Sequence, residues 1–269
     1  MILLLAAILP SLGGEPPDGA IKLQTPTVQY RMNEASATRS PWIDANGWRI
    51  LRQPTARYYY DVPAAAAALA AAEAFVYGAH ASVHTDVAGA ESFHRMADFL
   101  GRIPDRDLPP LANIGVVDDG SDQAGELMNL LSRRNLLYKI VSAPDRRLDL
   151  NVRIGSSEYP KEEANNPGRL AQKIRGQLTD EKRLLRIYGS EVVVARLSGD
   201  GERLRIHLLN YSTRTVAGLR VRVLGNYTRG SVMAFGKPDL KLQEYEARTD
   251  ATEFTLPEMS TYVVIDLSH

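Results

Sequence analysis

Three acidic side chains stand directly after apolar runs that are typical of buried strands. Asp86 follows residues 79–85, and Asp118 and Asp119 follow residues 113–117. Consecutive parallel strands joined by one helix are often neighbours, so their carboxyl ends are expected to meet at one edge of a sheet. Two carboxyl groups held about 5–9.5 Å apart can act as the acid and base of a glycoside hydrolase. We therefore predict Asp86, Asp118 and Asp119 as candidate catalytic residues.

The same residues also have a purely structural interpretation. Gly120 would turn the chain, and Ser121 or Asp122 would cap the helix that follows, where acidic side chains favour the positive end of the helix dipole. Asp86 would then pair with an arginine. The carboxyl–carboxyl separation, together with a cleft beside the pair, distinguishes the two interpretations.

A second candidate site surrounds the two tryptophans. Trp42 and Trp48 lie six positions apart, with Asp44 and Arg49 beside them. Flat aromatic faces stack on sugar rings, and the two charged side chains would supply polar contacts, so these four residues are predicted to bind a ligand such as a carbohydrate. The alternative is that both rings fill the core beneath a long loop.

Basic residues alternate with apolar ones in the C-terminal part. Arg203, Arg205 and His207 share one face of a predicted strand, and Arg220 and Arg222 share a face of the next. Such a face would bind an acidic polysaccharide, pair with the many acidic residues, or contact the preceding domain. The intervening apolar residues must face a core, and we expect five of them in particular to be buried: Ile206, Leu208, Val221, Val223 and Ile265.

The composition excludes several functions. The chain has no cysteine, which rules out disulfides, thiolate metal sites and a cysteine nucleophile. Its 32 basic and 32 acidic residues balance, so no nucleic-acid partner is expected. There is no glycine-rich nucleotide loop and no HExxH motif. His80, His84 and His94 are spaced too widely to converge on one ion, so we predict neither a metal site nor a cofactor.

The central part of the chain alternates helices and strands. Proline followed by alanines marks a helix that begins at residue 63, and apolar spacing marks further helices at residues 91–103, 126–135 and 161–178. Strands are expected at residues 48–51, 57–61, 79–85, 113–117, 137–141 and 148–154. This alternation predicts one parallel, doubly wound sheet.

The last part reads as short strands separated by turn residues, which predicts an antiparallel sandwich. We expect strands at residues 191–197, 203–211, 219–224, 231–235, 240–245, 252–256 and 261–267. The domains are therefore predicted as an α/β domain at residues 48–180 and a sandwich at residues 189–269, with a hinge between residues 178 and 191.

The N-terminal residues suggest export. Residues 1–13 are apolar and then small, as in a signal peptide cleaved after Gly13, although a basic first region is missing. The alternative is a wrongly chosen start or a buried strand. Residues 14–47 are predicted to be irregular. The apolar run is too short to span a bilayer, so no transmembrane segment is expected.

Two segments resemble parts of known glycosidases. Residues 113–154, with NIGVVDDGS and then GELMNLLSRRNLLYKIV, resemble the amidotransferase-like, flavodoxin-type domain that follows the barrel in trimeric β-galactosidases and related glycoside hydrolases. Residues 189–267, with RIHLLNYS and then EFTLPEMSTYVVIDL, are similar to sandwich domains that end many of these enzymes. The resemblance implies a flavodoxin-like α/β domain followed by an all-β antiparallel sandwich. The chain has no room for a complete catalytic barrel, and no catalytic residue of the family can be placed in it.

These observations favour an exported protein that recognises carbohydrate or assists a glycosidase, without a recognisable catalytic set. One alternative is a small glycan hydrolase that uses the paired carboxylates. The other is a structural protein that mediates oligomerisation, and the sequence leaves a homo-oligomer open.

Overall fold

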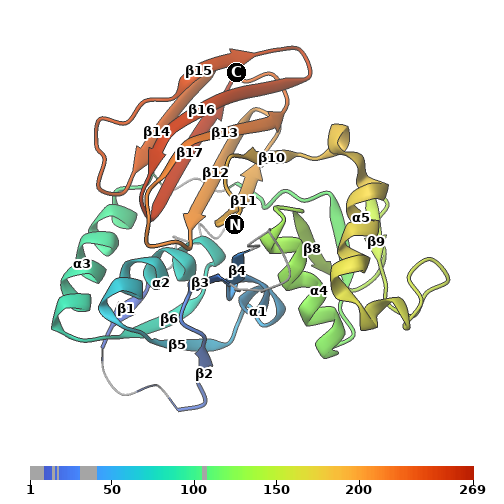
Figure 1. Ribbon diagram of the computed structural model, residues 1–269, viewed down its shortest axis with the longest axis horizontal. Helices are drawn as coiled ribbons and strands as arrows, with labels where there is room; N and C mark the ends of the chain where they lie inside the picture. Colours follow the sequence, from blue (N-terminus) through green and yellow to red (C-terminus); the bar gives the residue numbers. More distant parts are fainter. Residues whose placement is uncertain (1–8, 14–15, 17, 31–40, 105–107) are drawn as a thin grey trace, which may run out of the picture.

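The first α/β module is built on a parallel sheet of four strands in the order β1-β6-β5-β2 (Figure 1). The structure is a computed structural model and describes residues 9–13, 16, 18–30, 41–104 and 108–269. The elements of this module are β1 (Ser11–Leu12), β2 (Ile21–Leu23), β3 (Thr27–Tyr30), β4 (Pro41–Asp44), α1 (Gly47–Arg52), β5 (Arg57–Asp61), α2 (Ala64–Tyr77), β6 (His80–His84) and α3 (Val87–Gly101). Strands β3 and β4 form a separate antiparallel pair.

The alanine-rich composition of helix α2 follows from its position in the fold. It starts after Pro63 and ends at Gly78, which adopts the left-handed conformation that glycine accepts without strain. The helix is buried on nearly all sides, against β6, α3 and strand β12 of the sandwich. Alanine is the side chain that lets neighbours approach a helix closely from every direction, and it also has the highest helix propensity.

The second α/β module contains a parallel sheet of three strands in the order β8-β7-β9. Its elements are β7 (Ile114–Val117), α4 (Asp122–Arg133), β8 (Tyr138–Val141), β9 (Leu150–Val152), a 3-10 turn (Glu163–Asn165) and α5 (Pro167–Lys182). A core of its own includes Ile114, Val116, Leu127 and Leu131. Trp48 of α1 packs against this core and so connects the two modules.

The sandwich consists of two antiparallel sheets, in the orders β10-β13-β16-β15 and β11-β12-β17-β14. Its strands are β10 (Leu185–Tyr188), β11 (Val193–Gly199), β12 (Arg203–Asn210), β13 (Val216–Leu224), β14 (Arg229–Ala234), β15 (Gln243–Ala247), β16 (Ala251–Met259) and β17 (Tyr262–Ser268). The predicted core residues Ile206, Leu208, Val221, Val223 and Ile265 are all buried between the sheets, which confirms the predicted register.

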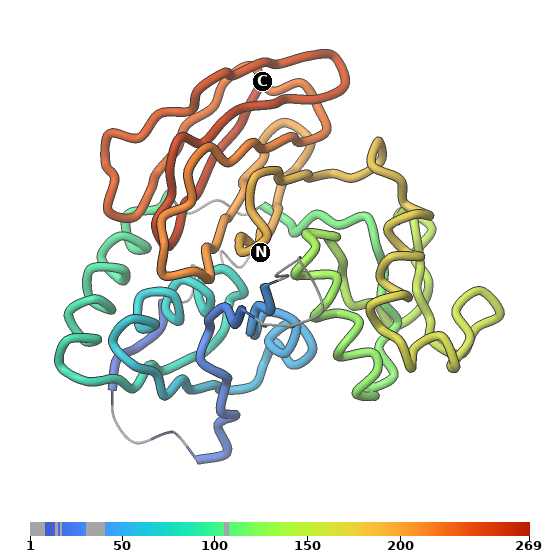
Figure 2. Tube along the Cα trace, in the orientation of Figure 1, coloured from blue at the N-terminus to red at the C-terminus, as the bar shows by residue number. Residues whose placement is uncertain are grey.

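The sandwich does not stand apart from the first module. Val194, Leu209, Tyr262 and Val264 belong to the same hydrophobic cluster as the alanines of α2, on the outer face of the β11-β12-β17-β14 sheet. The segment that connects the two α/β modules also runs along β11, where Leu111 N donates to Leu197 O (2.9 Å) and Gly199 N donates to Pro109 O (2.9 Å). Figure 2 shows the three units following one another along the chain while lying against one another in space.

The predicted fold class, an α/β domain followed by an antiparallel sandwich, is confirmed, but several details differ. The parallel strands form two sheets instead of one doubly wound sheet. Residues 48–51, expected as a strand, lie in helix α1. Residues 14–47, expected to be irregular, contain β2, β3 and β4. The sandwich begins at Leu185, before the predicted boundary. Most of the predicted signal segment, residues 1–8, lies outside the described residues.

Candidate functional site

Asp86 lies at the end of β6 and caps helix α3. Its Oδ1 accepts a hydrogen bond from Gly89 N (2.8 Å), which satisfies one of the free amides of the first turn. Gly89 is required there because a Cβ atom would lie 2.0 Å from Thr85 Oγ1. The geometry corresponds to a helix cap, with Gly89 rather than an arginine as the partner.

Asp118 and Asp119 follow β7 and are held by other partners. The guanidinium of Arg52 binds Asp118 through two hydrogen bonds of 2.7 Å, and Gly120 N donates a third (3.0 Å). The hydrogen bond from Arg52 is the main reason that the pKa of Asp118 lies below its usual value. Asp119 accepts from Ser121 Oγ (2.6 Å) and Ser121 N (2.9 Å), and these bonds likewise lower its pKa. Both carboxylates are thus stabilised in the ionised form.

The strands that precede Asp86 and Asp118 were expected to be neighbours in one sheet, and this expectation is wrong. Strand β6 belongs to the sheet of the first module, whereas β7 belongs to the separate sheet of the second. Their carboxyl ends therefore do not meet at a common edge. A general acid also needs a raised pKa, and Asp118 and Asp119 have lowered ones. The catalytic role of the three residues stays a prediction that lacks the expected pair.

Trp42 lies on β4 with one ring face covered. The guanidinium of Arg133 lies 3.9 Å from the ring centroid, and Trp42 Nε1 donates to Asp44 Oδ1 (3.1 Å). Asp44 also accepts from Gln29 Nε2 on the neighbouring strand (2.7 Å). These contacts hold the β3–β4 pair together, and they occupy groups that would otherwise contact a sugar.

Trp48 packs between α1 and α4. A Cβ atom on Gly125 of α4 would lie 2.7 Å from the Trp48 ring, so this glycine lets the two helices approach. The guanidinium of Arg49 lies 4.2 Å from the ring centroid, and burial lowers the pKa of Arg49. The arrangement favours the structural interpretation of this tryptophan, and the ligand-binding role of the four residues stays a prediction.

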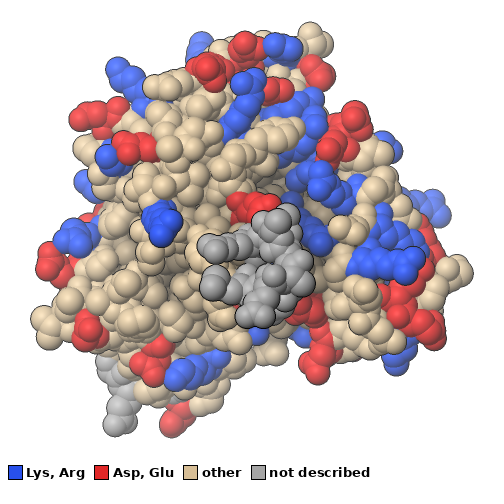
Figure 3. All heavy atoms as spheres, in the orientation of Figure 1, with Lys and Arg blue, Asp and Glu red and all other residues tan. Residues whose placement is uncertain are grey.

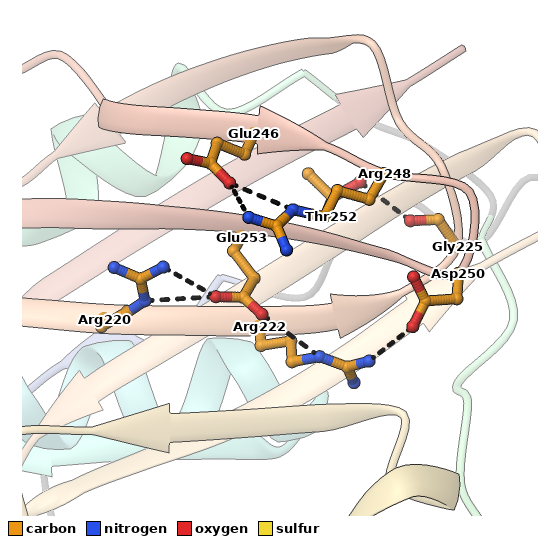
Figure 4. A network of polar contacts seen from close by, with 8 residues as sticks. All are labelled: Arg220, Arg222, Gly225, Glu246, Arg248, Asp250, Thr252 and Glu253. Carbon is orange, nitrogen blue, oxygen red and sulfur yellow. Dashed lines mark hydrogen bonds and ion pairs between the residues drawn. The ribbon is translucent and has the colours of Figure 1, made fainter.

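The basic residues of the sandwich are paired with acidic ones. On the outer face of β13, Arg220 binds Glu253 (2.8 Å) and Arg222 binds Asp250 (3.1 Å), within the network that Figure 4 shows. On β12, Arg205 is buried against Asp266, and His207 Nδ1 lies 2.7 Å from the hydroxyl of Tyr262. Burial lowers the pKa of His207 to about 3, so this imidazole is neutral. These residues form surface pairs and the contact with the first module.

A cavity of about 310 Å³, which we call the junction cavity, lies where the two α/β modules and the sandwich meet. Leucines from each unit line it, together with polar groups of Tyr77, Ser132, Tyr138 and Arg196. The Arg196 guanidinium donates to Val76 O (3.1 Å), lies 5.1 Å from the Tyr77 ring centroid, and has no carboxylate partner among the described residues. An apolar cavity with a few convergent polar groups is the usual form of a small-molecule site.

Sequence reasoning missed a buried carboxylate on α2. Glu73 has no solvent exposure and accepts four hydrogen bonds, from Asn46 N (2.7 Å), Asn46 Nδ2 (2.9 Å), Tyr60 OH (2.9 Å) and Tyr211 OH (2.5 Å). Tyr211 comes from the sandwich, so Glu73 connects it to the first module. The available signal was a single acidic residue within an otherwise apolar, alanine-rich helix.

Neither metal-binding clusters nor membrane-spanning helices occur among the described residues. Among them, no three histidine or acidic side chains gather to hold a metal ion, and His80, His84 and His94 form no such group. No helix in the described ranges has both the length and the apolar character needed to cross a membrane.

The comparisons with known proteins identify the fold. No family model matches the sequence, and no curated protein matches it. Among solved structures, α-L-fucosidase isoenzyme 2 from Paenibacillus thiaminolyticus is similar with a TM-score of 0.56 at 9% identity, covering 81% of this chain and 61% of that chain. The cold-adapted β-galactosidase from Rahnella sp. R3 (TM-score 0.44, 9% identity, 84% and 62% covered) and the β-galactosidase from Bacillus circulans sp. alkalophilus (0.45, 8%, 92% and 55%) are also found.

The chain therefore shares its fold with part of the α-L-fucosidase structure. It spans less than two thirds of the length of these structures.

Proposed function

We propose that this chain is an exported accessory part of a glycoside hydrolase system that recognises carbohydrate and does not itself cleave it. The observation that carries the proposal is the state of the strand-end carboxylates in a glycoside-hydrolase-like fold. Arg52 and Ser121 hold Asp118 and Asp119 in the ionised form. Asp86 caps helix α3, and the strand before it belongs to a different sheet. A pair of carboxyls with opposite protonation states, which glycoside hydrolysis needs, is not supported by this arrangement.

We place the sugar in the junction cavity. The apolar C–H face of a sugar ring is complementary to the leucines of the lining and to the Tyr138 ring, and its hydroxyl groups would accept from Arg196 and donate to Ser132. Because Arg196 has no carboxylate partner among the described residues, its remaining N–H groups are suited to bind ligand oxygens.

Titration calorimetry with neutral mono- and oligosaccharides tests this proposal. Arg196→Met keeps an unbranched apolar stem and removes the donors, so we expect sugar binding to weaken roughly tenfold or more, the usual cost of losing a hydrogen bond to a charged group. Arg153→Gln, at an exposed position away from the cavity, is the control and should bind like the wild type. No sugar binding by the wild type, or hydrolysis of aryl glycosides that Asp118→Asn abolishes, would refute the proposal.

Export has a separate test. If residues 1–13 are a signal peptide, protein recovered from outside the cytoplasm should begin at Gly14 when its intact mass is measured. Cleavage at this point would remove β1, which pairs with β6 at the edge of the first sheet. Recovery of exported protein that retains Met1 would contradict the predicted cleavage.

A further inference from the structure

Arginines gather in a second cavity, of about 400 Å³, which we call the arginine cavity. It lies between the sandwich and the second module, and Figure 3 shows basic side chains concentrated in this recess of a protein with no net charge. Besides Arg133, it is lined by Arg134 of the α4 end, Arg175 of α5, Arg183, and Arg186 of β10. The carboxylates in its lining are Asp180 and Glu191.

Only one of these carboxylates is paired with the arginines. Asp180 is shared by Arg183 (3.2 Å) and Arg175 (3.5 Å), whereas Glu191 is exposed and forms no ion pair with a described residue. The cations also act on one another: Arg175 and Arg186 contribute to lowering the pKa of Arg183, after the larger effect of burial. Among the described residues that line it, the cavity therefore has an excess of positive charge.

Two of the arginines have donors that lack an acceptor. Arg183 is only 8% exposed, and its Nη2 donates to the carbonyls of Arg134 (3.2 Å) and Asn135 (3.4 Å), yet its Nε has no hydrogen-bond partner. The Nε of Arg186 is also buried without a partner. A buried N–H group without an acceptor is costly, and buried polar groups in proteins are nearly always satisfied. An oxygen-rich anion in the cavity would bring negative charge next to both guanidinium groups.

The backbone beside the cavity is strained. Thr179 adopts φ 59° and ψ 161°, a conformation that is almost restricted to glycine, at a kink near the end of α5. The kink comes directly before Asp180 and precedes Arg183, so it determines where both side chains enter the cavity. Strain of this kind is found where the surrounding structure must hold a functional group in place.

We propose that the arginine cavity binds a tetrahedral oxyanion, the sulfate or phosphate group of a ligand. Planar guanidinium groups present paired N–H donors that match two oxygens of such a group, and several arginines around one position satisfy its double charge. The site is distinct from the junction cavity and does not depend on carbohydrate binding there. Of the residues that the structure describes, Asn135 alone lines both cavities.

Calorimetric titration with sodium sulfate and with sodium phosphate, at ionic strength kept constant with sodium chloride, tests the proposal. We expect saturable binding of one anion per chain and a matching rise in the melting temperature. Arg175→Gln combined with Arg186→Gln removes two cations while leaving the buried Arg183 in place, and should weaken binding by about 100-fold, or roughly tenfold for each charge-assisted contact. Arg146→Gln combined with Arg153→Gln removes the same charge from exposed positions and should leave binding unchanged.

The two anions distinguish the sources of the ligand. Sulfate stays doubly charged over the whole neutral range, whereas phosphate loses its second charge as the pH falls through about 6–7. Preferential binding of sulfate supports a sulfate ester, and preferential binding of phosphate above that range supports a phosphate group. Equal binding of chloride, or sulfate affinity that survives in the folded Arg175→Gln, Arg186→Gln variant, would overturn the proposal. The variant with lysine at both positions keeps the charge but loses the paired donors, and it should bind with intermediate affinity. This result would show that the weaker binding of the glutamine variant comes from lost charge and not from a folding defect.

Discussion

Replacing Glu73 by alanine is expected to lower the free energy of unfolding by roughly 3–5 kcal/mol, because each buried donor left without an acceptor costs about 1–3 kcal/mol. The variant would leave four buried donors, from Asn46, Tyr60 and Tyr211, without their acceptor. Urea denaturation measures the effect. Glu202→Ala, at an exposed position, is the control and should change little. A loss from Glu73→Ala as small as that of the control would contradict the role we assign to this carboxylate.

The pH dependence provides a second measurement on the same residue. Burial raises the pKa of Glu73 above its ordinary value of 4.5, even though its hydrogen bonds act in the opposite direction. A group with a raised folded-state pKa adds stability that is complete below its unfolded pKa and is lost as the pH rises through the folded one. Glu73→Gln has no such proton, so the wild type should gain stability relative to this variant as the pH is lowered toward 4.5. A difference that is constant, or that grows as the pH rises, would contradict this sign.

Replacing Arg205 by alanine should cost a similar amount, about 3–5 kcal/mol, because it breaks a buried ion pair. Arg205 binds Asp266 through Nε (2.7 Å) and Nη2 (2.8 Å), and its Nη1 donates to Pro104 O (2.8 Å) after the end of α3. The side chain of Arg205 is 7% exposed and that of Asp266 is 13% exposed, so solvent screens the pair only slightly. Thermal and urea unfolding report the loss.

The same substitution on the other sheet provides a matched control. Arg220 binds Glu253 on an exposed face, where ion pairs contribute little because water screens them. Arg220→Ala should therefore leave the unfolding midpoint almost unchanged. If both variants lost the same stability, burial would not explain the strength of the Arg205 pair.

The sandwich could be predicted from the sequence because its signal is local. Alternating apolar residues such as Ile206 and Leu208 define the buried face of a strand without knowledge of its neighbours, and both are fully buried. Helix α1 was not predictable in the same way. Its apolar residues resemble a strand, but Asn46 at its start is held by Glu73, and Trp48 packs on α4, so distant contacts determine its conformation.

The candidate sites depend even more on contacts between distant parts of the chain, which the sequence does not show. Strand order decides whether Asp86 and Asp118 meet, and the chain pattern alone does not show that β6 and β7 belong to different sheets. The Glu73 cluster and the arginine cavity each join residues from separate units. The sequence does show the lone acid in α2 and the dense charges around residues 180–186, but not which side chains converge there.

The outer face of the β11-β12-β17-β14 sheet affects how the chain can be divided. Val194, Leu209, Tyr262 and Val264 lie on that face and are covered by the alanine-rich helix α2. A C-terminal piece cut at the predicted hinge would expose this apolar face to water and lose the acceptor of the Tyr211 hydroxyl. Expressed alone, such a piece should self-associate or aggregate, since large exposed apolar patches drive association. We therefore expect the sandwich, although its strand pattern is that of a structural domain, to need the first module in order to stay soluble.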